Sequence, residues 1–209
     1  MLARPAPVRQ GTGPPECEGG PVLEPLDDTR SPRLVLRRPT AEDVPELFAM
    51  YSDPRVWEGD PLLRHLSRAR TEAAVERWGE GWRRHGLGLW VARAACGQGQ
   101  GDLVGVGGCN LPGEEAWNLA FTLRPESWGK GLAQEVAAAG TACARALRPD
   151  LPVTAAVAAR NERSLRAVER AGLVQVWRGP DAKDPDPAAE LVLCADRPLP
   201  EEQVRRLVR

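Results

Sequence analysis

The chain lacks most of the features that indicate a metal site, a disulfide framework or a secreted protein. Its five cysteines are odd in number and widely scattered, without a CxxC pair, and only two histidines accompany them. Such a set provides neither a disulfide framework nor the ligand spacing of a zinc site. We therefore expect a reduced, cytoplasmic protein that holds no metal.

Long apolar runs are missing as well. The longest, residues 132–147 and 153–159, are too short or too interrupted by polar residues to cross a bilayer. The N-terminus places Gly and Pro where a signal peptide needs an apolar run and a small-residue cleavage site. We expect neither a membrane segment nor a signal peptide.

A charge excess of one sign is also absent, because 28 basic side chains stand against 29 acidic ones. A nucleic-acid-binding domain usually carries a basic excess, so we expect no nucleic-acid partner. Any anionic ligand has to be bound by a local feature of the chain. With 209 residues and 42% hydrophobic content, the composition predicts one globular domain, as a monomer or a homodimer.

The sequence pattern divides the chain into three parts. Residues 1–32 repeat Pro and Gly and have few large apolar residues, so we expect a flexible leader. Residues 33–196 carry the periodic patterns of a folded domain. Residues 197–209 form a tail with room for a short helix.

Hydrophobic periodicity predicts the elements of the folded part. Strands are expected over residues 33–37, 88–94, 103–111, 117–123, 153–159, 173–178 and 189–194, with a Gly-rich turn at 97–101. Helices are expected over about residues 40–54, 67–84, 129–148 and 161–170. The order predicts an α+β fold, with one mixed, mostly antiparallel sheet of about six to seven strands and helices on both faces.

Gly129 and Gly131 mark the start of a long predicted helix, directly after a predicted strand. The first helical turn leaves backbone N–H groups unpaired and carries a partial positive charge, while Gly permits close approach of ligand oxygens. This start therefore predicts a phosphate cradle. It lacks the GxGxxG spacing of a dinucleotide-binding oxidoreductase and follows an antiparallel meander, so we set that class aside.

The same segment resembles the Q/RxxGxG/A loop with which GNAT acetyltransferases bind the pyrophosphate of coenzyme A. It consists of Trp128, Gly129, Lys130, Gly131, Leu132 and Ala133. Trp in place of Gln or Arg at the first position is similar to the WGKG form of the RimJ/RimL-like branch. Residues 161–173 resemble the NxxSxxxxxxxGF pattern of that branch, with Leu173 in place of Phe, and residues 33–57 resemble its opening segment.

The resemblance implies a GNAT fold and transfer of an acetyl group from acetyl-CoA to an amine. In the family the Asn of the second motif touches the pantetheine region and the Ser hydroxyl lies near the sulfur, which implies these roles for Asn161 and Ser164. The strand before the loop is implied to hydrogen-bond pantetheine near Leu123. The neighbouring arginines either form a solvated face or neutralise the 3'-phosphate of coenzyme A: Arg160, Arg163 and Arg166.

Two acid–base groups that are common in the family are absent. Asn118 stands where many members have a Glu that relays the proton of the amine, and Val168 stands where many have a Tyr as general acid. The resemblance therefore leaves Ser164 as the hydrogen-bond partner of the leaving sulfur. Asn118 takes the catalytic position on the strand, and no base is assured.

The acceptor pocket is expected in the loop between the first two helices. Trp57 is the aromatic residue expected to line it, and Glu58 or Asp60 could attract a cationic acceptor or act as base. His65 and His85 have a suitable intrinsic pKa for acid–base work, but each is flanked by Arg and neither lies in a motif. We expect both to be surface histidines.

A weak base favours an acceptor of low pKa. At pH 7, deprotonating a Lys side chain of pKa ~10.4 costs about 4.6 kcal/mol, whereas an α-amine near ~7.8 costs about 1 kcal/mol. A protein or peptide N-terminus is therefore our first hypothesis for the acceptor. The alternatives are an enzyme that acetylates a small molecule, such as an antibiotic, a polyamine or an amino acid, and a sensor that binds acyl-CoA without catalysis.

Overall fold

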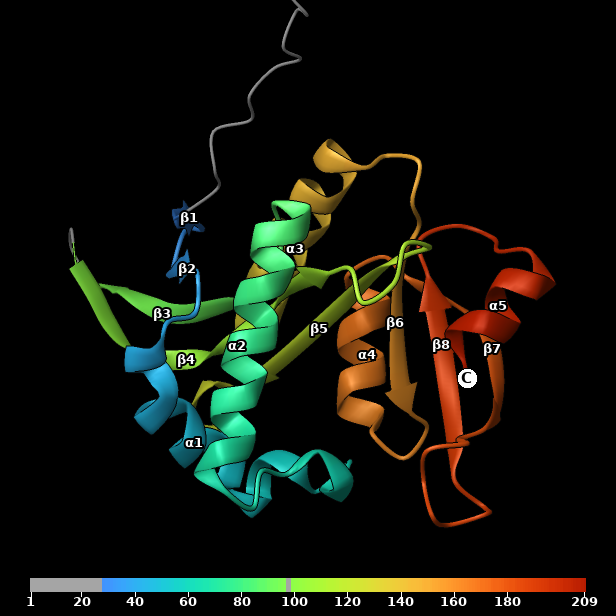
Figure 1. The fold of residues 1–209 in the computed structure, drawn as a ribbon, viewed down its shortest axis with the longest axis horizontal. Coiled ribbons are helices and arrows are strands. Elements are labelled where there is room, and N and C mark those ends of the chain that lie inside the picture. The colour runs from blue at the N-terminus through green and yellow to red at the C-terminus, as the bar shows by residue number, and fades with distance from the viewer. Residues whose placement is uncertain (1–27, 97–98) are drawn as a thin grey trace, which may run out of the picture.

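A computed structural model describes residues 28–96 and 99–209, and within them eight strands form one sheet (Figure 1). The strand order is β1-β2-β3-β4-β5-β6-β8-β7. The strands are β1 (Asp28–Arg30), β2 (Leu34–Arg37), β3 (Trp90–Cys96), β4 (Gly99–Asn110), β5 (Trp117–Leu123), β6 (Val153–Ala158), β7 (Val174–Pro180) and β8 (Glu190–Ala195). All neighbours pair antiparallel except β5 and β6, which run parallel.

Helices cover both faces of this sheet. They are α1 (Val44–Ser52), α2 (Arg68–His85), α3 (Leu132–Leu147), α4 (Glu162–Arg170) and α5 (Glu201–Leu207). Side chains alternate between the faces of a strand, so Val91 and Val106 pack with α1 and α2 while Trp90 and Ala92 belong to the core that includes α3 and α4. The result is the mixed α+β fold that the sequence predicts.

Helix α2 is capped at both ends by residues suited to those positions. Ser67 accepts a hydrogen bond from the backbone N–H of Arg70 at the start of α2, and Gly86 ends that helix with a φ of 68°. Helix α3 lies directly on β4, because a side chain on Gly140 would meet the backbone of Gly108 at 2.9 Å. This close contact sets the distance between the middle of α3 and the sheet.

The structure corrects two of the sequence-based predictions. The sheet has eight strands rather than six or seven, because Asp28–Arg30, which we placed in the flexible leader, pair with β2 as an edge strand. Residues 1–27 of that leader and residues 97–98 of the predicted turn lie outside the described residues. Helix α3 begins at Leu132 rather than at Gly129, because both loop glycines adopt positive φ.

The tail holds the short helix for which we left room, α5. Its Gln203 side chain donates to the backbone carbonyl of Glu115, at 2.9 Å, and thereby attaches the tail to the turn before β5. No helix in the described residues has the length and apolarity that a membrane span requires.

Candidate active site

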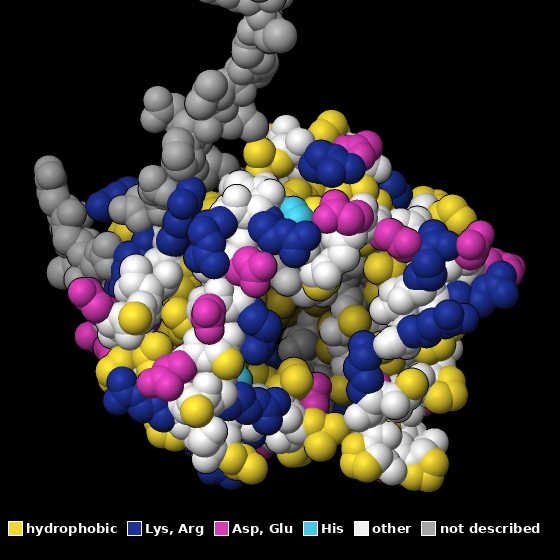
Figure 2. Space-filling view, in the orientation of Figure 1, with side chains coloured by type: hydrophobic (Ala, Val, Ile, Leu, Met, Phe, Trp, Pro, Cys, Tyr) yellow, Lys and Arg dark blue, Asp and Glu magenta, His cyan; other side chains and the backbone are white. Residues whose placement is uncertain are grey.

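Strands β5 and β6 separate along their length (Figure 1), and a cleft of about 550 Å³ opens between them. The two strands pair only at Trp117 with Val153 and at Asn118 with Thr154, and beyond these pairs they diverge. Figure 2 shows the surface hollowed beside α4. The cleft runs between the later residues of β5, the last residues of β6, the start of α3 and one side of α4.

The divergence leaves backbone groups of β5 facing the cleft. The carbonyls of Ala120 and Thr122 point to β4, since each lies within 3 Å of the place that a Cβ would take on Gly107 or Gly105 of that strand. Backbone groups alternate between the two edges of an antiparallel strand, so those of Phe121 point toward β6 instead. No pairing with β6 reaches this position in the described residues. The strand thus presents an edge that a ligand can extend.

The loop between β5 and α3 has the geometry of an anion site. Gly129 and Gly131 adopt φ values of 72° and 74°, a region that favours Gly. Among the described residues, no hydrogen bond is found from the backbone N–H groups of residues 129–133 to a protein acceptor. These amides lie at the start of a 16-residue helix, where the helix dipole adds positive potential.

Contacts from Arg33, the residue before β2, and from the loop itself fix this geometry. Arg33 donates to the carbonyl of Lys130 at 2.8 Å and also forms an ion pair with Glu135 of α3. Trp128 donates its indole N–H to the carbonyl of Leu123 at 2.9 Å. Lys130 is not among the residues that line the cleft, and its carbonyl is the group that holds Arg33 to the loop.

Helix α4 forms the opposite wall. Asn161 caps it, since the side-chain oxygen accepts the backbone N–H of Ser164 at 3.1 Å, and both residues line the cleft. Gln134 of α3 donates to the carbonyl of Ala167 at 3.0 Å and holds the two helices together. At the position where the family often has Tyr, Val168 is buried and offers no acid group.

Arginines of α4 give this wall a positive charge. The guanidinium of Arg163 lies 3.5 Å from the ring centroid of Trp128, so the two stack across the cleft wall. Arg166 also lines the cleft and forms an ion pair with Glu162 at 3.0 Å, and Arg170 lines it further along the helix. Anionic groups near the free amides would therefore meet cations from a second element.

The other end of the cleft is built by the segment between α1 and α2, which contains the short 3₁₀ turns η2 (Pro54–Trp57) and η3 (Pro61–Leu63). Trp57, Asp60 and Leu63 line the cleft here. Glu58, which we predicted as a pocket residue beside Trp57, is exposed and does not line it. The 3₁₀ turn ends at Trp57, and Glu58 follows on its outer side.

Asn118 also lines the cleft, near the point where β5 and β6 separate. Its amide nitrogen donates to the side-chain oxygen of Asn110 on β4 at 3.0 Å. An amide oxygen accepts hydrogen bonds but takes up no proton near neutral pH. Asn118 can therefore orient a ligand, and it does not replace the Glu that many family members carry.

An aromatic cluster supports this end of the cleft, beside Trp57, and it corrects our prediction for His65. This residue is 6% exposed rather than on the surface, because its ring stacks on Tyr51 at 4.5 Å and bonds Thr71 at 2.8 Å. Burial, with the charge of Arg70, lowers the pKa of His65 to about 4, so the ring is neutral at pH 7. Burial also raises the pKa of Tyr51 to about 12.

The structure brings most of the predicted site residues to this one cleft. Those that line it are Trp57, Asn118, Leu123, Trp128, Gly129, Gly131, Leu132, Ala133, Asn161, Ser164 and Arg166. Glu58 and Lys130 do not. Gln134 and Arg170 also line it and were not predicted, because neither belongs to a motif. Within the described residues, no cluster of three or more His, Cys, Asp or Glu side chains could hold a metal ion.

Comparisons with known proteins agree with this architecture. A family model described as an acetyltransferase (GNAT) domain matches residues 33–174. A GNAT-family acetyltransferase from Bacillus anthracis has a similar structure, with a TM-score of 0.63, 18% identity, and coverage of 80% of this chain and 96% of that one. So does RimL, a ribosomal L7/L12 alpha-N-protein acetyltransferase, with a TM-score of 0.63, 18% identity, and coverage of 81% and 92%.

A third similar structure is a spermidine N-acetyltransferase from Vibrio cholerae, with a TM-score of 0.60, 16% identity, and coverage of 78% of this chain and 94% of that one. Identities this low show a shared fold and no more. The family model is more specific, because its match runs from β2 through α4 and contains both the glycine loop and the α4 cap. On that match, the chain belongs to the GNAT acetyltransferase family.

Proposed function

We propose that this chain transfers an acetyl group from acetyl-CoA to an α-amine, as members of the RimJ/RimL-like branch do. One observation carries the proposal: unpaired backbone amides belong to Gly129 and to residues 131–133, which line the same cleft as Asn161 and Ser164. A pyrophosphate and a thioester of one elongated ligand could therefore be bound at the same time. When bound, acetyl-CoA supplies the acetyl group in activated form, as a thioester.

The residues present fit coenzyme A by charge and by shape. Free amides at the start of α3 suit a pyrophosphate, and Arg163, Arg166 and Arg170 add positive charge from α4. The open edge of β5 offers Phe121 backbone groups to the amides of a pantetheine arm. Each of these features faces the cleft, so a single extended ligand satisfies all of them.

Two polar side chains are proposed to act near the thioester. Ser164 lines the cleft, and its hydroxyl makes no hydrogen bond to another described residue, so it is available to donate to the leaving sulfur. A thiol pKa near ~8.5 makes the thiolate a good leaving group, so a hydrogen bond suffices without a strong acid. Asn118, held by Asn110, is proposed to orient the acceptor amine.

The acceptor is proposed to be the N-terminal α-amine of a protein or peptide. Its pKa near ~7.8 makes the neutral amine available for about 1 kcal/mol at pH 7, against about 4.6 kcal/mol for a Lys side chain. The cleft has no Glu on β5 and no Tyr at Val168 to assist a more basic amine. A polyamine or another small amine is the runner-up.

A thiol-release assay tests this function. Purified protein with acetyl-CoA is given a peptide with a free N-terminus and no Lys, the same peptide N-terminally blocked with one Lys, and spermidine. We expect thiol release and a mass gain of one acetyl group on the first peptide, with at least ten-fold lower rates on the other two acceptors. Turnover confined to spermidine or Lys would replace the proposed acceptor. Tight coenzyme A binding without thiol release from any amine would indicate a sensor.

Three sequence-based predictions remain part of this proposal. We expect a cytoplasmic location, in keeping with Cys109, Cys143 and Cys194, which are free thiols in the described structure. We expect a monomer or a homodimer and no nucleic-acid partner. Size-exclusion chromatography with light scattering measures the oligomeric state directly.

A further inference from the structure

Asp60 differs in charge from the other residues described as lining the cleft. Among the residues that the structure describes, it is the only carboxylate in the cleft lining. The other charged side chains of the lining are arginines of α4. A transferase that acts on amines must bind a cation and remove a proton from it, and a carboxylate suits both tasks.

The segment that carries Asp60 is held from the α4 side by Arg160. This arginine donates to the carbonyl of Gly59 at 3.2 Å and to the carboxylate of Asp184 at 2.7 Å. Gly59 itself lies against the Asn161 side chain so closely that an added Cβ would sit 2.7 Å from it. The segment between α1 and α2, residues 53–67, which we call the acceptor segment, is therefore built onto the cap of α4.

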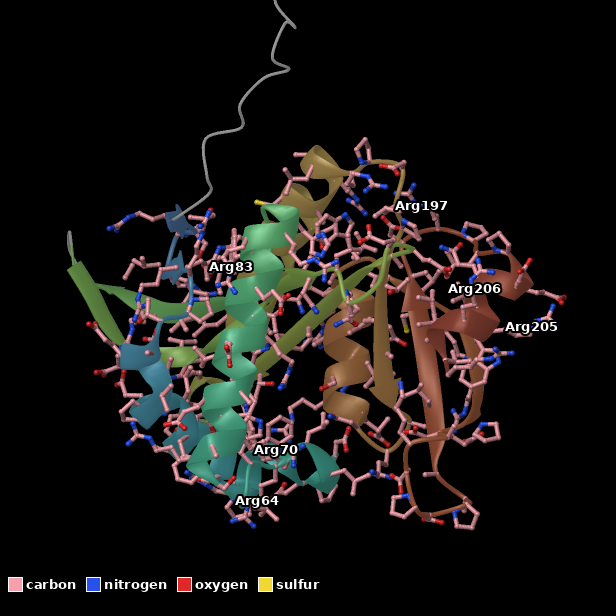
Figure 3. The ribbon with its side chains drawn as sticks, viewed as in Figure 1. Arg64, Arg70, Arg83, Arg197, Arg205 and Arg206 are labelled. Carbon is pink, nitrogen blue, oxygen red and sulfur yellow. The ribbon has the colours of Figure 1, made fainter. Side chains whose placement is uncertain are left out.

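From the other side, two arginines of the α2 region hold the same segment, and Figure 3 shows both at the start of that helix. Arg70 donates to the carbonyls of Leu62 and Arg64, both at 3.1 Å. Arg64 in turn donates to the carbonyl of Ser52 at 2.8 Å. Contacts on both sides give Asp60 a fixed place although it lies between two short 3₁₀ turns.

The charge of Asp60 is only partly neutralised by the protein. Its carboxylate is 3.7 Å from Arg160, which makes its short contact with Asp184 instead. The Asp60 side chain is 25% exposed, so one side remains open to the cleft. A cationic group that enters the cleft would thus meet a carboxylate with capacity for a further hydrogen bond.

The surroundings also make Asp60 a better proton acceptor than a surface Asp. Burial raises its pKa, the charge of Arg160 opposes this rise, and the negative charges of Asp181 and Asp184 add to it, while the Leu62 amide lowers it. The net direction is upward. A higher carboxylate pKa narrows the gap to an α-amine, which makes proton transfer between them easier.

We propose that Asp60 binds the ammonium group of the acceptor and accepts its proton. The inference rests on the proposed function and chooses between Glu58 and Asp60, which the sequence left as alternatives, because only Asp60 lines the cleft. Trp57 and Leu63 line the cleft on the same segment, so the part of the acceptor next to its amine meets apolar walls. An uncharged, apolar first residue on the acceptor suits this environment.

The acceptor ammonium gives one proton to the Asp60 carboxylate, and the neutral nitrogen forms a bond to the acetyl carbon. The carbon–sulfur bond breaks, and a second proton leaves the nitrogen for the sulfur, which departs as a thiol. Asp60 then releases its proton to water and returns to the carboxylate form.

A binding experiment without acetyl-CoA tests the recognition half. The probes are a Lys-free peptide with a free N-terminus and the same peptide with a hydroxyl in place of that amine, both titrated calorimetrically at pH 6.5. Because charge-assisted hydrogen bonds contribute about 1.5–3 kcal/mol, the wild type should bind the amine about 10- to 150-fold more tightly. Asp60→Asn should lose most of this preference. Equal affinity of the wild type for both probes overturns the proposal, even if the variant fails to fold.

Kinetics test the proton-transfer half. Since a general base typically contributes 10²- to 10⁴-fold, Asp60→Asn should lower kcat/KM at pH 7 by at least about 100-fold, and its activity should recover as pH rises. Asp60→Glu should retain more activity than Asp60→Asn. The control Glu76→Gln removes one negative charge from an exposed position on α2 and should behave as wild type.

The outcomes separate the two proposals. If the wild type acetylates amines and Asp60→Asn matches it within about three-fold at every pH, with coenzyme A affinity intact, only the role of Asp60 is wrong. If the wild type acetylates no amine at all, the proposed function fails and this inference fails with it. Calorimetric coenzyme A binding by each variant shows that the phosphate end of the cleft is preserved.

Discussion

Gly86 and Gly129 form a matched pair that can separate backbone strain from ligand binding. They adopt φ values of 68° and 72°, and at neither position would an added Cβ meet another atom within 4 Å. Gly86 ends α2, and its N–H donates to the carbonyl of Trp82 at 3.0 Å. Gly129 precedes α3 and has an unpaired N–H. An alanine at either site is thus strained by the same backbone conformation and by nothing else.

The effect on stability should be equal for the two variants. A left-handed conformation costs an ordinary residue about 1–2 kcal/mol, so Gly86→Ala and Gly129→Ala should each reduce the free energy of unfolding by that amount. In a chain of this length, each kcal/mol lowers Tm by about 2–4 °C. Chemical denaturation and thermal scans of the ligand-free proteins measure both quantities.

The effect on coenzyme A binding should differ. Gly129→Ala favours a negative φ, which turns the following amides away from the cleft, and losing one charge-assisted hydrogen bond costs about 1.5–3 kcal/mol. Kd should therefore rise about 10- to 150-fold, while Gly86→Ala should leave it unchanged. Calorimetric titration with coenzyme A provides the comparison. Equal Kd values for the two variants would refute the assignment of the phosphate group to this loop.

Three further perturbations follow from the structure. The neutral, buried His65 has its pKa lowered from 6.5 to about 4, so its contribution to stability is complete above pH 6.5 and is lost as pH falls toward 4. Urea unfolding of the wild type should therefore lose about 3 kcal/mol more than His65→Gln over that range, and parallel pH profiles would contradict this. Arg163→Ala should weaken coenzyme A binding about 5- to 10-fold. Arg163→Lys should weaken it less than Arg163→Ala, because Lys keeps the positive charge and loses only the stacking of a planar guanidinium on the Trp128 indole. Titrations with coenzyme A at two salt concentrations measure both Kd values. Gly59→Ala would place a methyl group 2.7 Å from the Asn161 side chain, so the variant should lose about 1–3 kcal/mol in chemical denaturation. An unchanged denaturation midpoint would show that the acceptor segment is not packed against α4.

Local patterns in the sequence predict the elements that depend on local interactions. Strand β5 runs over Trp117–Leu123, as the apolar alternation predicts, and α4 starts directly after the Asn161 cap. The edge strand Asp28–Arg30 was missed for a physical reason. These residues have no alternation of their own and become a strand only by pairing with β2. Propensity contains no information on such a partner.

In the candidate site, too, the sequence predicts features that depend on local geometry and misses those that depend on tertiary contacts. Gly129 and Gly131 are recognisable from the sequence because positive φ at a helix start requires Gly there, whatever surrounds it. His65 was expected on the surface from its Arg neighbour, and it is buried because Tyr51, fourteen positions earlier, stacks on it. Burial of a loop residue is decided by such tertiary contacts, which neighbouring residues in the sequence do not reveal.

The distribution of charge in the cleft shows why composition could exclude partners but could not identify the ligands. The chain is nearly neutral, with a net charge of −1, so its average field favours neither an anion nor a cation. Within the cleft, however, the charges are separated, with arginines on α4 and the free amides of α3 on one side and Asp60 on the acceptor segment. Interactions between charges fade beyond about 10 Å in salt, so a ligand responds to the groups within the cleft rather than to the total. A neutral protein can thus bind a polyanion at one end of a cleft and an ammonium group at the other.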